Sequence, residues 1–227
     1  MSYLLYLESI QMTKLITFIS AIAFLMLSCN QGNLLLEEEK ALVKSLNFDA
    51  KIINQIKGTT SNVIAQLPNI NEETGEIGQS TFAGIYSQST EQQAMDFILK
   101  NKREFRKKGH LIFLFEGAGN RKNIAVIKGR DELDILRYRG TNGLNYNLDN
   151  DDIVAKVEGW DAKYGANVIG CSRDWMHIEF DVLPSSVKLF ADEVYEFCPD
   201  SVDQGVGSVK ELQKAIVEMH GVWLWWD

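Results

Sequence analysis

Three ionisable residues alternate with apolar residues from Met176 to Val182, where His177, Glu179 and Asp181 occupy every second position. Alternate side chains of a β-strand point to the same face and lie about 7 Å apart, so these groups would share one face. A hydrolase could use the histidine with nearby carboxylates for acid–base chemistry. Clean alternation also predicts a strand with one face on the core and the other in water, and we favour this interpretation.

The histidine and cysteine residues give only weak support for a metal site. The H-x-E element of His177 and Glu179 is similar to that of zinc deaminases, which need a P-C-x-x-C run downstream. Here Cys198 precedes Pro199 and no further cysteine follows, so we expect no metal and no cofactor. Cys171 and Cys198 fall at apolar positions of a predicted strand and helix, where small buried thiols are common. A disulfide between them is the alternative.

Two predicted loops concentrate hydrogen-bonding side chains, namely Asn142, Asn145 and Tyr146 in the first and Asp200, Asp203 and Gln204 in the second. Such side chains either recognise a ligand or satisfy their own turns, and both alternatives stay open. If the domain binds a ligand, we expect the two loops to face each other. The cleft would be acidic and would favour an amine, a sugar or a cationic protein patch over phosphate.

A glycine-rich turn, Gly205–Ser208, precedes a predicted helix and would present backbone N–H groups to an anion. A simple turn with Ser208 as the N-cap of that helix explains the same residues at least as well. We therefore treat this turn as a weak site signal.

The N-terminus carries a targeting pattern. Thirteen largely apolar residues, Leu15–Leu27, follow Lys14 and fall short of the roughly 20 residues that a membrane span requires. The segment that ends in Ser28 and Cys29 resembles the lipobox of bacterial lipoproteins, in which the cysteine carries the lipid. We expect residues 1–28 to be a cleaved signal peptide and Cys29 to anchor the protein in a membrane. Met12 is an alternative start to Met1, because residues 1–11 contain an acid and no base.

The remaining chain predicts an α+β fold, with mixed α/β as the alternative, because helices and strands are interleaved. We expect residues 29–80 to form a tether, a helix over 34–57 and a loop over 58–79 with a short strand near 63–65. Residues 81–227 would form the α+β domain. Its predicted strands are 82–86, 110–115, 123–128, 166–171, 176–182 and a C-terminal strand buried on both faces, and a Gly-Ala-Gly-Asn turn joins the second strand to the third. Its predicted helices are 89–108, 131–138, 151–164, with Asp149 as the N-cap, and two more between 187 and 219.

The formal net charge is −8. A nucleic-acid partner would need a clustered basic surface, so we expect none. The one basic run, from Lys102 to Lys108, fits cations at a helix C-terminus.

Four segments of the C-terminal half resemble an uncharacterised bacterial family, domain of unknown function 4253. They are Arg139–Tyr146, Trp160–Gly165, Cys198–Gly207 and Leu224–Asp227, and the resemblance covers roughly residues 120–227. It implies a shared fold and no activity.

We therefore expect a lipoprotein of the bacterial cell envelope, in a membrane leaflet that the sequence does not specify. Its domain would bind a small polar ligand or a cationic protein without catalysis, one version being an immunity-type lipoprotein that neutralises a toxin. The alternative is an envelope hydrolase that uses His177.

Overall fold

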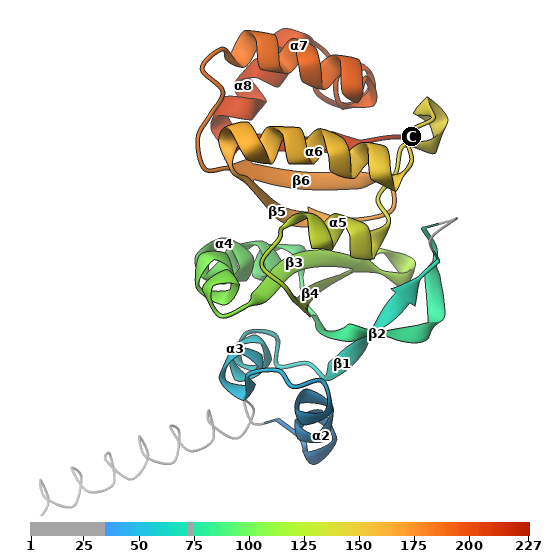
Figure 1. Ribbon diagram of the computed structural model, residues 1–227, viewed down its shortest axis with the longest axis vertical. Coiled ribbons are helices and arrows are strands. Elements are labelled where there is room, and N and C mark those ends of the chain that lie inside the picture. Colours follow the sequence, from blue (N-terminus) through green and yellow to red (C-terminus); the bar gives the residue numbers. More distant parts are fainter. Residues whose placement is uncertain (1–34, 72–74) are drawn as a thin grey trace, which may run out of the picture.

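A seven-stranded sheet with helices on both faces forms the protein, in a computed structural model that describes residues 35–71 and 75–227 (Figure 1). The strand order is β1-β2-β4-β3-β5-β6-β7. The strands are β1 Ile64–Ile70, β2 Ile77–Gln88, β3 His110–Gly117, β4 Arg121–Lys128, β5 Ala166–Cys171, β6 Trp175–Phe180 and β7 Gly221–Trp225. The helices are α2 Glu37–Ser45, α3 Ala50–Thr60, α4 Glu91–Lys107, α5 Leu133–Arg139, α6 Asn150–Tyr164, α7 Val187–Phe197 and α8 Val209–Met219.

The sheet is antiparallel except between β3 and β5, which are parallel. Parallel neighbours require a crossover connection, and α5 and α6 supply it between β4 and β5. Figure 1 shows these two helices along one face of the sheet. The predicted α+β class is therefore confirmed.

Two hydrophobic clusters cover the opposite faces. One joins the sheet to α5, α6, α7 and α8, with Trp160 in edge contact with Phe180, Phe190 and Phe197. The other joins the sheet to α2, α3 and α4. Strand β3 lies between them and is buried on both faces from His110 to Phe115, which is typical of a central strand with a continuous apolar run.

The predicted helix over 34–57 is wrong in its continuity, because the structure has α2 and α3 in its place. Asn47 adopts a left-handed conformation with φ 54° and breaks the helix, and asparagine tolerates this conformation better than most residues. Asp49 then begins α3, where its side chain accepts a hydrogen bond from the amide of Lys51.

The predicted loop over 58–79 is wrong for most of its length, because β1 and the start of β2 lie there and pair with each other, and the short strand predicted near 63–65 is the start of β1. The register of β1 shifts on both sides of Pro68, so its buried residues are Ile64, Leu67 and Ile70 rather than every second residue. Such irregularities remove the alternation by which strands are recognised. Residues before Thr81 are consequently part of the same sheet as the segment that follows.

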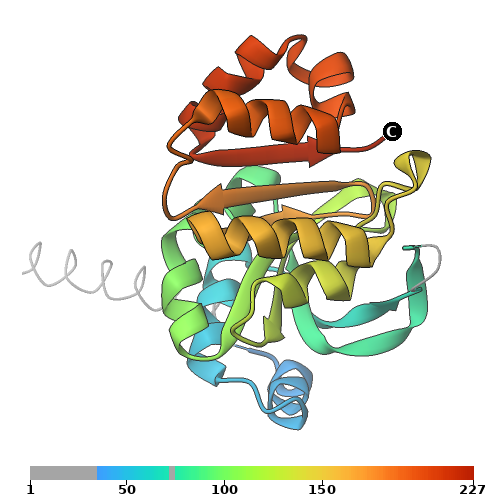
Figure 2. The same ribbon diagram turned by 45° about the horizontal axis from the view of Figure 1, so that its top comes forward.

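The C-terminal strand β7 pairs only with β6 and forms one edge of the sheet, next to α8 (Figure 2). Leu224 is fully buried, but Trp223 is 42% exposed. The prediction that both faces of this strand are covered is therefore wrong. Trp223 and Trp225 stack on each other on the more open face, with ring centroids 6.5 Å apart.

Strand β6 differs in two ways from the expected strand with one buried face and one face exposed to water. Val182 lies beyond the strand and is 65% exposed, although it was grouped with the apolar face. His177 and Glu179 are half-buried rather than open to water.

Two predicted helix starts are confirmed. Asp149 caps α6 and accepts a hydrogen bond from the amide of Asp152, and Ser208 caps α8 through the amide of Glu211. Within the described ranges, no helix is both long and apolar enough to cross a membrane. The predicted signal peptide and Cys29 lie outside those ranges.

Candidate functional site

The two polar loops meet through the carboxylate of Asp200. Its Oδ1 accepts hydrogen bonds from the hydroxyl of Tyr146 at 2.6 Å and from Nε2 of Gln204 at 3.0 Å. Its Oδ2 accepts one from the backbone amide of Asp227 at 2.9 Å. The side chain is only 4% exposed, so this carboxylate ties the first loop to the C-terminus.

The electrostatics of this contact follow from its hydrogen bonds. Burial alone would raise the pKa of Asp200, but the bonds from Tyr146, the amide of Asp227 and Gln204 hold that pKa below its usual value. The same bond to Asp200 raises the pKa of Tyr146 to about 12. Asp200 is thus an ionised acceptor whose bonding capacity is largely used within the protein.

The other predicted residues divide between the interior and the surface. Asn142 is 8% exposed; its side chain donates to the carbonyl of Gly140 and its amide to the carbonyl of Arg173. Asn145, Asp203 and Gln204 are exposed, and Asp203 accepts a hydrogen bond from the hydroxyl of Tyr195 at 3.1 Å. A ligand role for these residues stays a prediction.

Close packing holds the first loop against the end of the chain. A Cβ on Gly143 would lie 2.8 Å from Cδ1 of Trp226, so only glycine fits without displacing the indole. The hydroxyl of Thr141 donates to the carbonyl of Ser172 at 2.7 Å. The contact between Gly143 and Trp226 connects two of the segments that carry the family resemblance, Arg139–Tyr146 and Leu224–Asp227.

Arg139, the last residue of α5, is the charged group that the sequence analysis missed as a site residue. It is 4% exposed, and its Nη1 donates to the carbonyl of Gly75 at 2.7 Å. Its Nε is closed off from solvent and has no hydrogen-bond partner, and the guanidinium forms no ion pair within the described residues. Burial lowers its pKa, yet arginine keeps its proton at neutral pH.

A pocket of about 430 Å³ opens at Arg139. Three turns surround it: the segment before β2, the β3–β4 turn and the β5–β6 turn. Its other lining residues are Gly75, Glu76, Ile77, Glu116, Gly117, Ala118, Gly119, Asn120, Ser172, Arg173 and Asp174. Nη2 of Arg139 has no acceptor among the described residues and is not among the atoms closed off from solvent, so it is available to an occupant of the pocket.

Gly75 is required where it stands. Its φ is +66°, and a Cβ there would lie 2.9 Å from Cγ of Arg173 and 3.3 Å from Nδ2 of Asn142. The absence of a side chain therefore lets the Gly75 carbonyl reach Arg139.

Acidic and basic groups alternate around this pocket. Arg173 pairs with Glu76 at 2.7 Å, and Lys122 pairs with Glu116. Asp174 is exposed, and its attraction opposes the effect of burial on the pKa of Arg139.

The side chains of His177, Glu179 and Asp181 form no hydrogen bond or ion pair with one another. Burial, with a smaller effect from the charge of Lys102, lowers the pKa of His177 to about 4, and its Nε2 has no partner in the part of the chain described. Burial raises the pKa of Glu179. Asp181 instead accepts from Asn167 at 3.1 Å and pairs with Arg103 at 3.3 Å. No cluster of metal-binding side chains occurs in residues 35–71 and 75–227.

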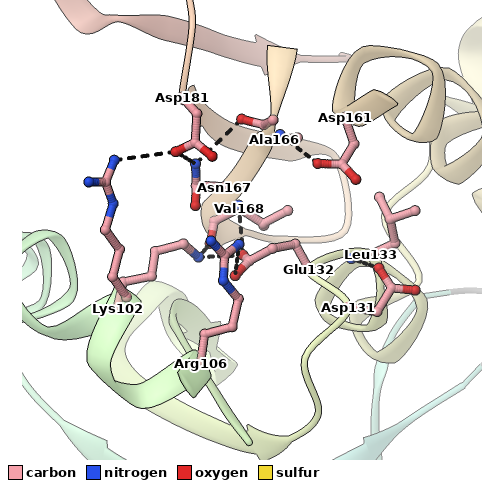
Figure 3. Close-up of polar contacts among 12 residues, drawn as sticks. Lys102, Arg106, Asp131, Glu132, Leu133, Asp161, Ala166, Asn167, Val168 and Asp181 are labelled. Carbon is pink, nitrogen blue, oxygen red and sulfur yellow. Dashed lines mark hydrogen bonds and ion pairs between the residues drawn. The ribbon is translucent and has the colours of Figure 1, made fainter. Parts of the chain in front are cut away.

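A buried ion pair joins helices on opposite faces of the sheet (Figure 3). Lys102 of α4 pairs with Glu132, which precedes α5, and donates to the carbonyl of Val168 at 2.7 Å. Glu132 also accepts from the amide of Val168 at 3.0 Å and from Arg106 at 3.3 Å. The interpretation of the whole basic run as helix-end cations is therefore wrong for Lys102, because its side chain is 5% exposed and faces the interior.

Both cysteines of the described residues are free and buried, as their apolar positions predicted. Burial raises the pKa of Cys171 to about 12. The thiol of Cys198 lies 3.0 Å from the hydroxyl of Ser201 and 3.1 Å from the carbonyl of Trp225.

One sequence signal could have identified Arg139. In α5 it follows Ile135 by four residues and Leu136 by three, so it lies on the face that these residues bury. An arginine on an apolar stripe needs a partner or a function.

A comparison of the chain with protein-family models agrees with the resemblance in the C-terminal half. The chain has no match among the curated proteins or the solved structures. Arg139, Ser172, Arg173 and Asp174 lie inside the region that matches a family model, whereas Gly75, Glu76 and Glu116 precede it. Residues 123–227, from β4 to the C-terminus, match the family described as Domain of unknown function (DUF4253).

Proposed function

We propose that the protein is a lipid-anchored protein of the bacterial cell envelope whose domain binds a small ligand with an anionic group, without catalysis, in the pocket at Arg139. The observation that carries the binding site is the buried guanidinium without a carboxylate partner in the described residues. A buried charge without a counter-charge costs several kcal/mol. An anion in the pocket would offset this cost.

Arginine suits such a ligand particularly well. The free Nη2 of its guanidinium can donate a charge-assisted hydrogen bond to a carboxylate, and such bonds are roughly twice as strong as neutral ones. Nη1 is held by Gly75, so the orientation of the group is fixed before a ligand arrives. A group fixed in advance loses little freedom on binding.

Binding is favoured over the hydrolase alternative by the state of His177. A general base works best when its pKa lies near the operating pH, whereas the pKa of His177 is lowered to about 4. At neutral pH this histidine is a neutral group and a poor proton acceptor.

A binding experiment with the full-length protein in detergent tests the site. Propionate and other short carboxylates should raise the melting temperature of the wild-type protein, and above the Kd the rise should grow with the logarithm of the carboxylate concentration. Arg139→Met should lose this response. Its unliganded melting temperature should stay close to the wild-type value, because a buried charge replaced by an apolar side chain of similar size is often neutral or stabilising.

The matched control is Arg137→Met. Arg137 lies two residues earlier in α5, is partly exposed and pairs with Asp131 and Asp134. The melting temperature of the Arg137→Met variant should rise with added carboxylate as that of the wild-type protein does. An equal response in the Arg139 and Arg137 variants, or no response to any carboxylate at 10 mM or so, would refute the pocket.

The anchor rests on the apolar segment Leu15–Leu27 and the cysteine that follows it. Cells that express the protein should incorporate labelled palmitate into it, and Cys29→Ser should abolish labelling and leave the uncleaved precursor. Cys171→Ser is the control and should remain labelled. An unlabelled wild-type protein would show that there is no lipid anchor, independently of the pocket.

A further inference from the structure

The charges around the pocket at Arg139 restrict what kind of anion it can hold. Three carboxylates line it, from Glu76, Glu116 and Asp174. Two of them have basic partners, Arg173 and Lys122. Asp174 forms no ion pair in the described residues, and its side chain is exposed. A cationic group that entered the pocket would therefore find a carboxylate available.

An anion without a positive group should bind in this pocket more weakly than a zwitterion does. Asp174 and Glu116 attract Arg139, which places both carboxylates within Coulomb range of the guanidinium that would hold the ligand. They would repel a dianion such as phosphate. A ligand with one carboxylate and one ammonium group would avoid this repulsion, because its ammonium can face the carboxylates while its carboxylate faces the guanidinium.

We propose that the pocket binds a zwitterion of the α-amino acid type, with its carboxylate on Arg139 and its ammonium on Asp174. The inference rests on the proposed function and names the ligand class of the same site. Both residues lie in the region that matches the family model, whereas the turns at Gly75 and Glu116 precede it.

A second hollow provides room for a side chain. A groove of about 280 Å³ adjoins the pocket and shares Ile77, Gly117 and Ala118 with it. Amide side chains, including Gln66 and Gln79, line this groove. Amides can both donate and accept hydrogen bonds, so an amino acid with a polar side chain would fit better than glycine.

The experiment screens the twenty amino acids against the full-length protein by calorimetry and then compares the tightest ligand with its analogue that lacks the ammonium group. The wild-type protein should bind the amino acid more tightly than the analogue. Asp174→Asn should lower the affinity for the amino acid by about fivefold, which is the upper range for a partly exposed ion pair. It should leave the affinity for the analogue unchanged. Arg139→Met should abolish both.

Asp192→Asn is the matched control, because it removes an exposed carboxylate of α7 that does not line the pocket. It should leave both affinities unchanged. If the amino acid and its analogue bind equally to the wild-type protein and both depend on Arg139, the zwitterion is wrong and the anion pocket stands. If inorganic phosphate binds more tightly than any amino acid and this binding depends on Arg139, the zwitterion proposal is likewise wrong and the anion pocket stands. If no carboxylate binds in a manner that depends on Arg139, both proposals fail.

Discussion

Among the charged residues, Glu132 should be the one whose substitution lowers the stability of the fold most. The substitution Glu132→Gln tests this. The variant keeps the size and shape of the side chain but leaves Lys102 with a positive charge in the interior and no carboxylate beside it. Removal of one partner of a buried ion pair costs about 3–5 kcal/mol. Each kcal/mol lowers the melting temperature of a chain of this size by about 2–4 °C, so we expect a loss of about 6–20 °C.

The loss should depend on pH in a defined direction. Burial lowers the pKa of Lys102, and the attraction of Glu132 raises it. Glu132→Gln removes the second effect, so the pKa of Lys102 in the folded variant falls further below its unfolded value. Between these two pKa values the unfolded chain binds more protons than the folded one, and stability then rises with pH. The deficit of the variant should be larger at pH 6 than at pH 10.

The double variant Lys102→Met/Glu132→Gln separates the charge from the loss of shape. Its glutamine can still accept a hydrogen bond from the amide of Val168, and the interior no longer holds a lysine charge without a carboxylate. We expect most of the stability to return. Urea unfolding of the three proteins at both pH values provides the measurement. A single variant that loses less than about 1 kcal/mol, or a double variant no more stable than the single one, would refute the reasoning.

Three further predictions concern other parts of the fold. Trp226→Ala should cost about 3–5 kcal/mol because the indole is 3% exposed, whereas Trp223→Ala, at a 42% exposed position, should cost less than about 1 kcal/mol; equal losses in urea unfolding would contradict the edge position of β7. Asp200→Asn should destabilise the protein near pH 6, and the difference should vanish as pH falls through the lowered pKa of the wild-type carboxyl, which acid titration of unfolding measures. The thiols of Cys171 and Cys198 should resist a disulfide reagent at pH 8 until the protein is denatured, because both are buried and burial raises both pKa values; rapid labelling of either native thiol, located by peptide mapping, would contradict this.

The sequence determined the elements that depend on local interactions. The helix α6 begins at Asp149, as the position of that residue before an apolar stripe predicted, and Ser208 begins α8 for the same reason. The hairpin of β3 and β4 was also predicted, because its apolar runs are continuous and are separated by a short glycine-containing turn. In these segments the pattern within about ten residues is enough to specify the structure.

The sequence did not determine elements whose local pattern is irregular. Strand β1 was predicted only as a short strand near 63–65, because the register shifts around Pro68 replace the alternation of buried residues with a spacing of three. The burial of β7 was overestimated because apolar residues occupy both of its faces, although one face of an edge strand can remain open. Residue types do not reveal whether another layer covers a face.

Only the tertiary structure determined the state of the charged groups. Lys102 and Glu132 are 30 positions apart, and either would pass for a surface residue in its own segment. The pocket at Arg139 likewise requires Gly75, Glu116 and Asp174, which lie in three separate segments of the chain. The physical reason is that the cost of a charge depends on the dielectric surroundings and on its partner. Both are set by segments that meet only when the sheet has assembled, and so a local pattern cannot specify them.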